Sequence, residues 1–124
     1  MTFFNCTSLE SIEIPSSIEK LEEGWCDGVI FLNQIKVSPH NPYFKLYEGQ
    51  FIIGKSSPEK ENFDVLAFSI RKIKLAIIPD FIEIIGSYAF SNSKLSNIKM
   101  SSNSKLRIIE KYAFSHCLIE KFVI

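Results

Sequence analysis

The residues GQFIIGKS, from Gly49 to Ser56, match a spacing that binds phosphate in many proteins. The pattern G-x-x-x-x-G-K-[ST] forms a loop whose backbone amides and lysine cradle nucleotide phosphates. Such a loop needs a buried strand before it and a helix that begins at its Lys-Ser pair. Here PYFKLYE is a poor buried strand, QFII favours a strand over an open cradle, and Ser57-Pro58 disfavours a helix. We therefore expect no nucleotide and no other cofactor at this segment.

Other reactive residues also fit structural roles better than chemical ones. Cys26-Asp27 with a distant His40 would suggest a thiol nucleophile, but Cys26 falls on a repeated core position. His116 beside Cys117 lacks the further ligands that a metal site needs. Three cysteines without a C-x-x-C pair favour buried free thiols (Cys6, Cys26 and Cys117). The sequence thus predicts no catalytic residue and no metal ligand.

The motif Asn41-Pro42-Tyr43-Phe44 resembles the NPxF peptides that phosphotyrosine-type adaptor domains bind. Asn-Pro is also a common turn former. We favour the turn, because it needs no partner.

Composition bounds the class of protein. The chain has 124 residues, 46% of them apolar, which suits a single globular domain. Fourteen basic and fourteen acidic side chains cancel, so no overall field attracts nucleic acid or an anionic membrane. No apolar run is long enough to span a membrane, and the N-terminal residues resemble no signal peptide. The acidic residues concentrate near the N-terminal end and the basic ones near the C-terminal end.

The sequence repeats with a period of 23–24 residues. At a shift of 23, Ile12 and Ile14 fall on Ile35 and Val37, and at a shift of 24 IIGSYAFSNSKLSNIKM falls on IIEKYAFSHCLIEKFVI. The alternating apolar pair predicts a short strand with one buried face, which the following proline ends. Because one such unit cannot bury its apolar face alone, successive units must stack.

The repeated unit is L-x-x-I-x-I-P-x-x-I-x-x-I-G-x-x-A-F-x-x-C-x-x-L, and it resembles the BspA-type leucine-rich repeat of bacterial and protist surface antigens. The resemblance implies a mainly β, right-handed repeat solenoid with short parallel strands joined by turns or short helical segments. We expect one domain over 1–124, with partial repeats at 1–8 and 119–124. The complete repeats are expected at about 9–31, 32–74, 75–94 and 95–118.

An insertion at about 38–68 interrupts the repeats. We expect a β-hairpin in which Phe51–Gly54 runs out, KSSPEKEN turns, and Phe63–Phe68 returns. Ala67-Phe68-Ser69 also echoes the Ala-Phe-Ser of two later repeats. Residues 65–68 therefore fit either a return strand or the degenerate end of a repeat.

Function in such a fold belongs to a surface, because outward strand residues form columns along the sheet. The resemblance implies a non-enzymatic protein-binding module of the adhesion or surface-antigen type, with a host or matrix protein as partner. An intracellular interaction scaffold and a fragment of a longer repeat protein remain open, as does the compartment. The predicted protein-binding face comprises Glu13, Gln34, Lys36, Ile77, Asn97, Lys99 and Val123.

The two ends of the chain suggest a second kind of contact. The strand that ends at Ile124 would present an unpaired edge, and its flank is basic, whereas the first repeat is acidic. Head-to-tail contact would pair opposite charges and continue the stack. We therefore expect self-association.

Overall fold

The computed structural model describes residues 10–21, 25, 32–117 and 121–123. Within those ranges the chain forms short strands joined by turns, and it contains no helix. The resemblance implied that turns or short helical segments join the strands. In the described residues, the connections are turns. The strands are β1 (Ser11–Ile14), β2 (Gln34–Val37), β3 (Phe44–Tyr47), β4 (Phe51–Gly54), β5 (Val65–Ser69), β6 (Leu75–Ile77), β7 (Ile84–Ile85), β8 (Asn97–Lys99), β9 (Ile108–Ile109) and β10 (Lys121–Val123).

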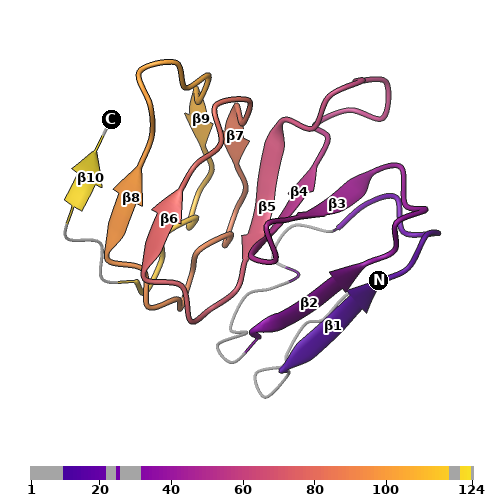
Figure 1. Ribbon diagram of the computed structural model, residues 1–124, viewed down its shortest axis with the longest axis horizontal. Coiled ribbons are helices and arrows are strands. Elements are labelled where there is room, and N and C mark those ends of the chain that lie inside the picture. The colour runs from indigo at the N-terminus through magenta and orange to yellow at the C-terminus, as the bar shows by residue number, and fades with distance from the viewer. Residues whose placement is uncertain (1–9, 22–24, 26–31, 118–120, 124) are drawn as a thin grey trace.

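Parallel ladders join successive repeats (Figure 1). β1 pairs with β2 between residues 23 apart, β6 with β8 between residues 22 apart, and β8 with β10 between residues 24 apart. Ile12 pairs with Ile35 and Ile98 with Phe122, which confirms the alignment of the repeats. From β6 onward the chain alternates between two sheets, because β7 and β9 extend a second ladder from β5.

The alternating sequence of β1 explains its burial. Ile12 and Ile14 face the core, whereas Ser11 and Glu13 are exposed. Pro15 follows directly and has no N–H to donate, so the strand ends there. The amide of Ile18 then donates to Pro15 O (3.3 Å), and Ile82 donates in the same way to the carbonyl of the proline that follows β6 (3.1 Å).

The insertion forms a three-stranded antiparallel unit. β4 and β5 pair as the hairpin predicted from the sequence. The segment before Gly49 forms the strand β3, which pairs with the whole of β4. It is a poor buried strand, as expected, because only Phe44 of its four residues is buried. Positive φ at Glu48 (51°) and Gly49 (70°) forms the kind of turn that matches the twist of paired strands. Gln50 N closes this turn on Tyr47 O (3.1 Å).

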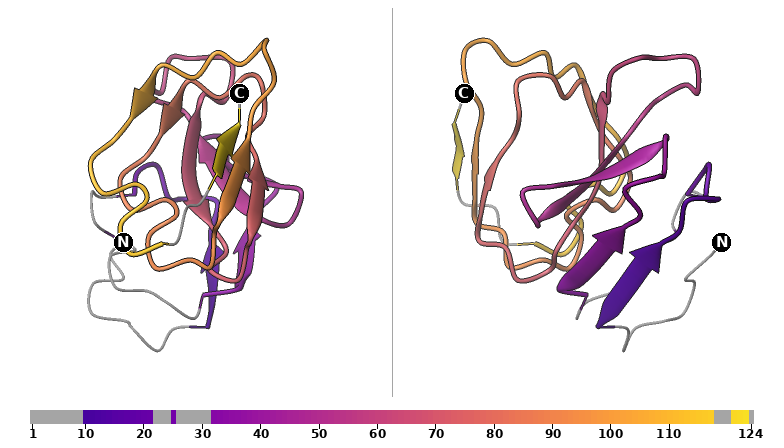
Figure 2. Two further views of the ribbon diagram at one scale, coloured as in Figure 1. Left: turned by 90° about the vertical axis from the view of Figure 1, so that its left-hand side faces the viewer. Right: turned by 45° about the vertical axis from the view of Figure 1, so that its right-hand side comes forward.

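β5 belongs to the hairpin and to the repeats at once. It pairs antiparallel with β4 on one side and parallel with β7 on the other. The two interpretations of residues 65–68 are therefore both correct. The five-stranded sheet in the order β3–β4–β5–β7–β9 joins the insertion to the later repeats, and the two views of Figure 2 show this sheet from other sides.

Aromatic rings from different parts of the chain contact one another in a core that is mostly aliphatic. Phe90 is fully buried, lies parallel to Phe114 (centroids 5.4 Å, planes 9°) and meets Phe51 edge-on (6.0 Å, 78°). Phe51 comes from the insertion and Phe114 from a later repeat. The insertion therefore shares its core with the repeats.

The side-chain amide of Asn41 holds the insertion to the first repeat. Asn41 is 7% exposed, and its Nδ2 donates to Pro15 O (2.8 Å) and Ile18 O (3.0 Å). Its Oδ1 accepts from the amides of Tyr43 (2.7 Å) and Phe44 (3.0 Å). The Asn-Pro segment is thus a turn with a buried asparagine, as the sequence favoured.

Arg71 is a buried cation between repeats. It is 1% exposed, and its guanidinium lies 4.4 Å from the centroid of the Phe68 ring. Nη1 donates to Ala89 O (2.9 Å) and Nη2 to Tyr88 O (3.2 Å). The side chain therefore reaches the backbone of the next Ala-Phe turn and fixes the spacing of the two repeats.

Candidate protein-binding surface

The structure places the phosphate-loop pattern in a hairpin. Gly49 lies in the turn before β4, and Phe51 to Ile53 are almost completely buried. The Ser56 amide and hydroxyl donate to the carboxylate of Asp64 (2.8 and 2.5 Å). The amide and hydroxyl that would face a phosphate are thus bound to a carboxylate. The match to the nucleotide motif is accidental.

Lys55→Ala should change the free energy of unfolding by less than about 1 kcal/mol. The Lys55 ammonium lies 5.2 Å from the centroid of the Phe63 ring, and this is the contact that the substitution removes. Chemical denaturation checks the stability. Saturable ATP binding by the wild type that is lost in Lys55→Ala would contradict the hairpin interpretation.

The other reactive residues do not form a cluster where the structure describes them. His116 has positive φ (60°) in an exposed turn, and the Cys117 thiol donates to Phe114 O (3.0 Å). In the described part of the chain, no group of three or more His, Cys, Asp or Glu lies close enough to hold a metal ion. Cys6 and Cys26 lie outside that part.

The predicted face is divided between two sheets. Glu13 pairs with Lys36 and Ser11 with Gln34 in the β1–β2 ladder. Ile77 pairs with Lys99 and Leu75 with Asn97 in the β6–β8 ladder, which β10 extends through the backbone of Val123. No ladder joins β2 to β6 among the described residues. The predicted side chains of β1, β2, β6 and β8 are exposed or half-buried, whereas the side chain of Val123 lies outside the description.

The insertion and the chain just before β2 both contact the segment that precedes β6. Just before β6, Arg71 N still donates to Leu32 O (3.0 Å), so the two repeats begin side by side. The amide of Ile70, however, donates to Gln50 O (2.9 Å), which follows the β3–β4 turn. The β3–β4 hairpin thus contacts the chain directly after β5, in the segment that leads to β6.

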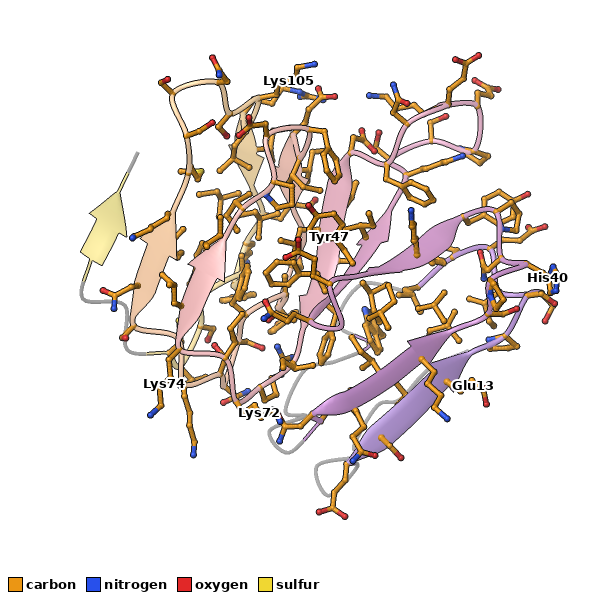
Figure 3. All side chains as sticks on the ribbon, in the orientation of Figure 1. Glu13, His40, Tyr47, Lys72, Lys74 and Lys105 are labelled. Carbon is orange, nitrogen blue, oxygen red and sulfur yellow. The ribbon has the colours of Figure 1, made fainter. Side chains whose placement is uncertain are left out.

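The face of β6 and β8 combines exposed apolar and basic side chains. We call Leu75, Ile77, Asn97 and Lys99 the β6–β8 face. Ile77 is 63% exposed and Leu75 41%, and both lie on β6, which is an edge strand of its sheet in the described part of the chain. No Asp or Glu occurs from Val65 to Pro79 or from Ser91 to Ile109. The exposed lysines of these segments are Lys72, Lys74, Lys94, Lys99 and Lys105, three of which are labelled in Figure 3.

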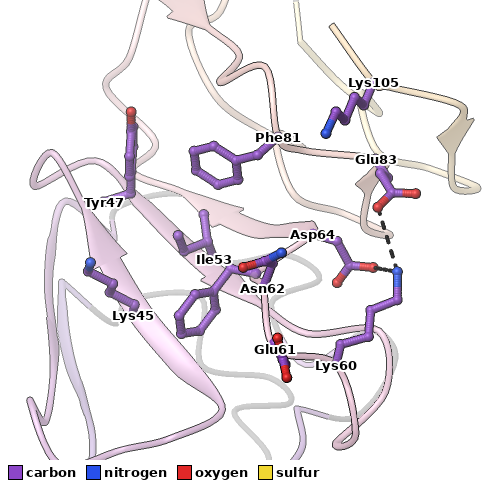
Figure 4. A pocket seen from close by; sticks show the side chains of 11 residues that line it. Lys45, Tyr47, Ile53, Lys60, Glu61, Asn62, Asp64, Phe81, Glu83 and Lys105 are labelled. Atoms are coloured by element: carbon purple, nitrogen blue, oxygen red, sulfur yellow. Dashed lines mark ion pairs between the residues drawn. The ribbon is translucent and has the colours of Figure 1, made fainter.

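A second feature is a hollow beside the insertion, which we call the hairpin hollow (Figure 4). Its volume is about 940 Å³. Tyr47 and Phe81 meet edge-on in it (centroids 5.7 Å, planes 71°), beside the buried Ile53. Its lining comprises Lys45, Tyr47, Ile53, Lys60, Glu61, Asn62, Phe63, Asp64, Phe81, Glu83 and Lys105.

Ion pairs on one side of the hollow connect the hairpin to the repeats. Lys60 Nζ lies 3.0 Å from Asp64 Oδ2 and 3.6 Å from Glu83 Oε2, and Arg107 Nε donates to Glu83 Oε1 (3.1 Å). Burial acts to raise the pKa of Asp64, but hydrogen bonds from Ser56 and Lys60 outweigh it and hold the pKa below its usual value. The hydrogen bond from Arg107 and the charge of Lys60 lower the pKa of Glu83. Both carboxylates are thus ionised and already paired.

The comparisons with known proteins agree with the repeat. The family model of the BspA type leucine-rich repeat region matches residues 1–51 and 61–124 in six copies. The chain belongs to this family. The unmatched residues, 52–60, fall in β4 and the loop after it. No curated protein gives a significant match.

A solved leucine-rich repeat protein from Eubacterium ventriosum has a similar fold. The two structures superpose with a TM-score of 0.71 and share 18% sequence identity. The alignment covers 94% of this chain and 32% of that protein chain. The present chain therefore spans about a third of that protein's length. Leucine-rich repeat families are generally non-enzymatic and generally mediate protein–protein interaction. No helix in the described part of this BspA-type chain is long and apolar enough to cross a membrane.

The hairpin hollow was not predicted from the repeated sequence. One signal was present, because Phe81 falls on Ser17 when Pro15 is aligned with Pro79. A large apolar residue at a turn position that is otherwise polar marks an exposed aromatic ring. Nothing in the sequence placed Tyr47 beside it, because that contact depends on the strand β3.

Proposed function

We propose that this BspA-type chain is a non-enzymatic protein-binding module whose contact surface is the β6–β8 face. The observation that carries the proposal is the exposure of two neighbouring aliphatic side chains, Leu75 and Ile77, on the outward side of β6. Apolar centres with polar surroundings are typical of protein interfaces. The surrounding lysines and the lack of nearby Asp or Glu in sequence favour a partner with an acidic surface. Of the remaining predicted residues, Glu13, Gln34 and Lys36 on β1 and β2 form a separate and mixed-charge part of the proposed face, and Val123 belongs to β10.

The repeats are proposed to wind as a right-handed solenoid with the boundaries given above. Parallel strands joined by a crossover are almost always right-handed, because the twist of the strands favours that hand. The parallel ladders with partners 22–24 residues apart support this arrangement. A crystal structure with left-handed coils would contradict it.

Replacing both Leu75 and Ile77 by serine should weaken partner binding about 30-fold or more, because interface anchors each cost more than about 1 kcal/mol when truncated. The control replaces Tyr112 by serine, because Tyr112 is 50% exposed and lies in a turn outside the β6–β8 face. Partners are identified as proteins retained by the immobilised wild type and by the control but not by the face variant, and affinities are then measured by calorimetry. Equal retention by all three proteins would contradict the proposal.

The identity of the bound partner and the accessibility of the chain on intact cells distinguish an adhesion role from an intracellular one. We propose adhesion, which the family resemblance supports, so purified matrix proteins should bind the wild type and lose affinity for the face variant. Proteolysis of intact producing cells should then remove the chain. A chain that is protected in intact cells and binds a cytoplasmic protein through the same face would instead support the scaffold. A wild type that binds duplex DNA in preference to proteins would contradict both.

We also propose head-to-tail self-association at micromolar concentration. β10 and β9 end their sheets in the described structure, and Ile108 and Ile109 on β9 are exposed. Edge strands with apolar side chains favour pairing with another chain. Light scattering should show association that high salt weakens only in part, because salt screens charge but not apolar contact. A monomer across that concentration range would contradict this proposal.

A further inference from the structure

We propose that the hairpin hollow is a second docking site, for a peptide segment of a partner protein that carries an apolar side chain flanked by Asp or Glu. This inference does not rest on the β6–β8 face. It rests on the shape of the hollow, on its aromatic rings and on the charges around it.

The apolar part of the site comes from two separate elements. Tyr47 ends β3 and Phe81 follows β6, and the two rings meet edge-on at 5.7 Å. Phe81 remains 37% exposed although it touches another ring. Ile53 also lines the hollow and is 2% exposed. An aliphatic or aromatic side chain placed against these residues would cover a surface that the fold leaves open to water.

The charges select an acidic partner. The carboxylates of Asp64 and Glu83 are neutralised by Lys60 and Arg107. Lys45 and Lys105, by contrast, form no ion pair with any residue that the structure describes. Figure 4 shows that they come from opposite sides of the Tyr47–Phe81 pair.

Glu61 is the remaining acidic residue of the lining, and in Figure 4 its carboxylate points away from the two rings. The charge that is available beside the rings is therefore positive. Carboxylates on both sides of an apolar anchor would complement it.

A peptide fits this site better than a small polar ligand does. No buried side-chain nitrogen or oxygen in the described part of the chain lacks a hydrogen-bond partner. Small-ligand sites usually fix their ligand with a few convergent polar groups in an enclosed cavity. Here the available groups are flexible lysines around exposed rings, which suits an extended segment that inserts one side chain.

The test measures binding of three fluorescein-labelled hexapeptides to the full chain by fluorescence anisotropy. The probe is acetyl-Glu-Glu-Leu-Phe-Glu-Glu-amide. One control replaces every Glu by Lys, and the other replaces Leu-Phe by Gly-Ser. The probe should bind with a dissociation constant of about 100 μM at low salt and at least about 10-fold more tightly than either control. Equal binding of the acidic and basic peptides, or no saturable binding, would overturn the proposal.

Variants assign the binding to the hollow. Replacing Lys45 and Lys105 by Glu should weaken binding of the probe about 10-fold or more. The matched control replaces Lys20 and Lys111 by Glu; both are exposed and lie outside the lining of the hollow and outside the β6–β8 face. It changes the net charge by the same amount and should alter affinity less than about 2-fold. If the control weakens binding as much, the attraction is a general effect of charge and the site does not exist.

Phe81→Ser tests the apolar contact separately. Because the ring is partly exposed, the variant should fold, which its melting temperature verifies, and it should lose about 10-fold in affinity for the probe. Ile77→Ser should bind the probe like the wild type, because Ile77 does not line the hollow. This variant distinguishes the failure of the docking site from the failure of the proposed β6–β8 face.

Discussion

Phe90→Ala should lower the free energy of unfolding by about 3–5 kcal/mol, the usual cost of removing a buried phenylalanine. Phe90 is fully buried and touches rings from two other parts of the chain, Phe51 in the insertion and Phe114 in a later repeat. Its removal leaves a cavity between these rings, and the rigid ladders on both sides cannot close it. Denaturant unfolding followed by circular dichroism measures the effect.

Two further variants provide a comparison for the loss of stability in Phe90→Ala. Lys99→Ala removes an exposed side chain on β8 and should cost less than about 0.5 kcal/mol. The equivalent positions of Phe90 and Phe114 in the repeat predict similar losses of stability. The structure corrects that expectation, because Phe114 is only half-buried. Phe114→Ala should therefore lower the free energy of unfolding less than Phe90→Ala does. Similar midpoints for Phe90→Ala and Lys99→Ala would show that the interior positions are wrongly assigned.

The repeats could be predicted from the sequence because the same physical demand recurs along the chain. The pairing of Ile12 with Ile35 and of Ile98 with Phe122 follows from aligning apolar residues that must face one core. The hairpin of β4 and β5 followed from two apolar runs around a polar turn. β3 was not predicted because FKLY has a weak burial pattern, in which only Phe44 is buried.

The candidate surfaces were predictable only in part. Alternation along each strand correctly placed Glu13, Lys36, Ile77 and Lys99 on the outside. The division of the face was not visible, because the period of a repeat does not say where an insertion contacts its neighbours. The hairpin hollow depends on a contact between residues 34 positions apart, Tyr47 and Phe81. Local patterns carry no information on such a pair.

The connection between the insertion and the first repeat was equally invisible, since it depends on one buried amide. Asn41 uses its two amide hydrogens and its oxygen in four hydrogen bonds to backbone atoms. An aspartate at this position would have almost the same shape and would keep the two accepted bonds. It would, however, place an oxygen against the carbonyls of Pro15 and Ile18, which lie 2.8 and 3.0 Å from Nδ2. Replacing Asn41 by Asp therefore tests the hydrogen bonds that Asn41 donates, because it leaves the shape of the side chain almost unchanged.

Asn41→Asp should destabilise the chain by about 3 kcal/mol at neutral pH, because it buries a charge that faces two carbonyl oxygens. Asn103→Asp, which adds the same charge at an exposed position, should cost less than about 0.5 kcal/mol. Burial and the facing carbonyls should raise the pKa of the new carboxyl above its unfolded value of about 4. The charge penalty is then absent below the unfolded pKa and grows as the pH rises towards the folded pKa.

The stability difference between Asn41→Asp and the wild type should accordingly narrow when the pH falls from 7 to about 4. Taking the difference cancels the acid lability that both proteins share, including the stability lost as Asp64, with its lowered pKa, becomes protonated. Urea denaturation at both pH values provides the measurement. A difference that stays constant with pH would mean that the carboxylate at position 41 is hydrated, and that Asn41 does not connect the insertion to the first repeat in solution.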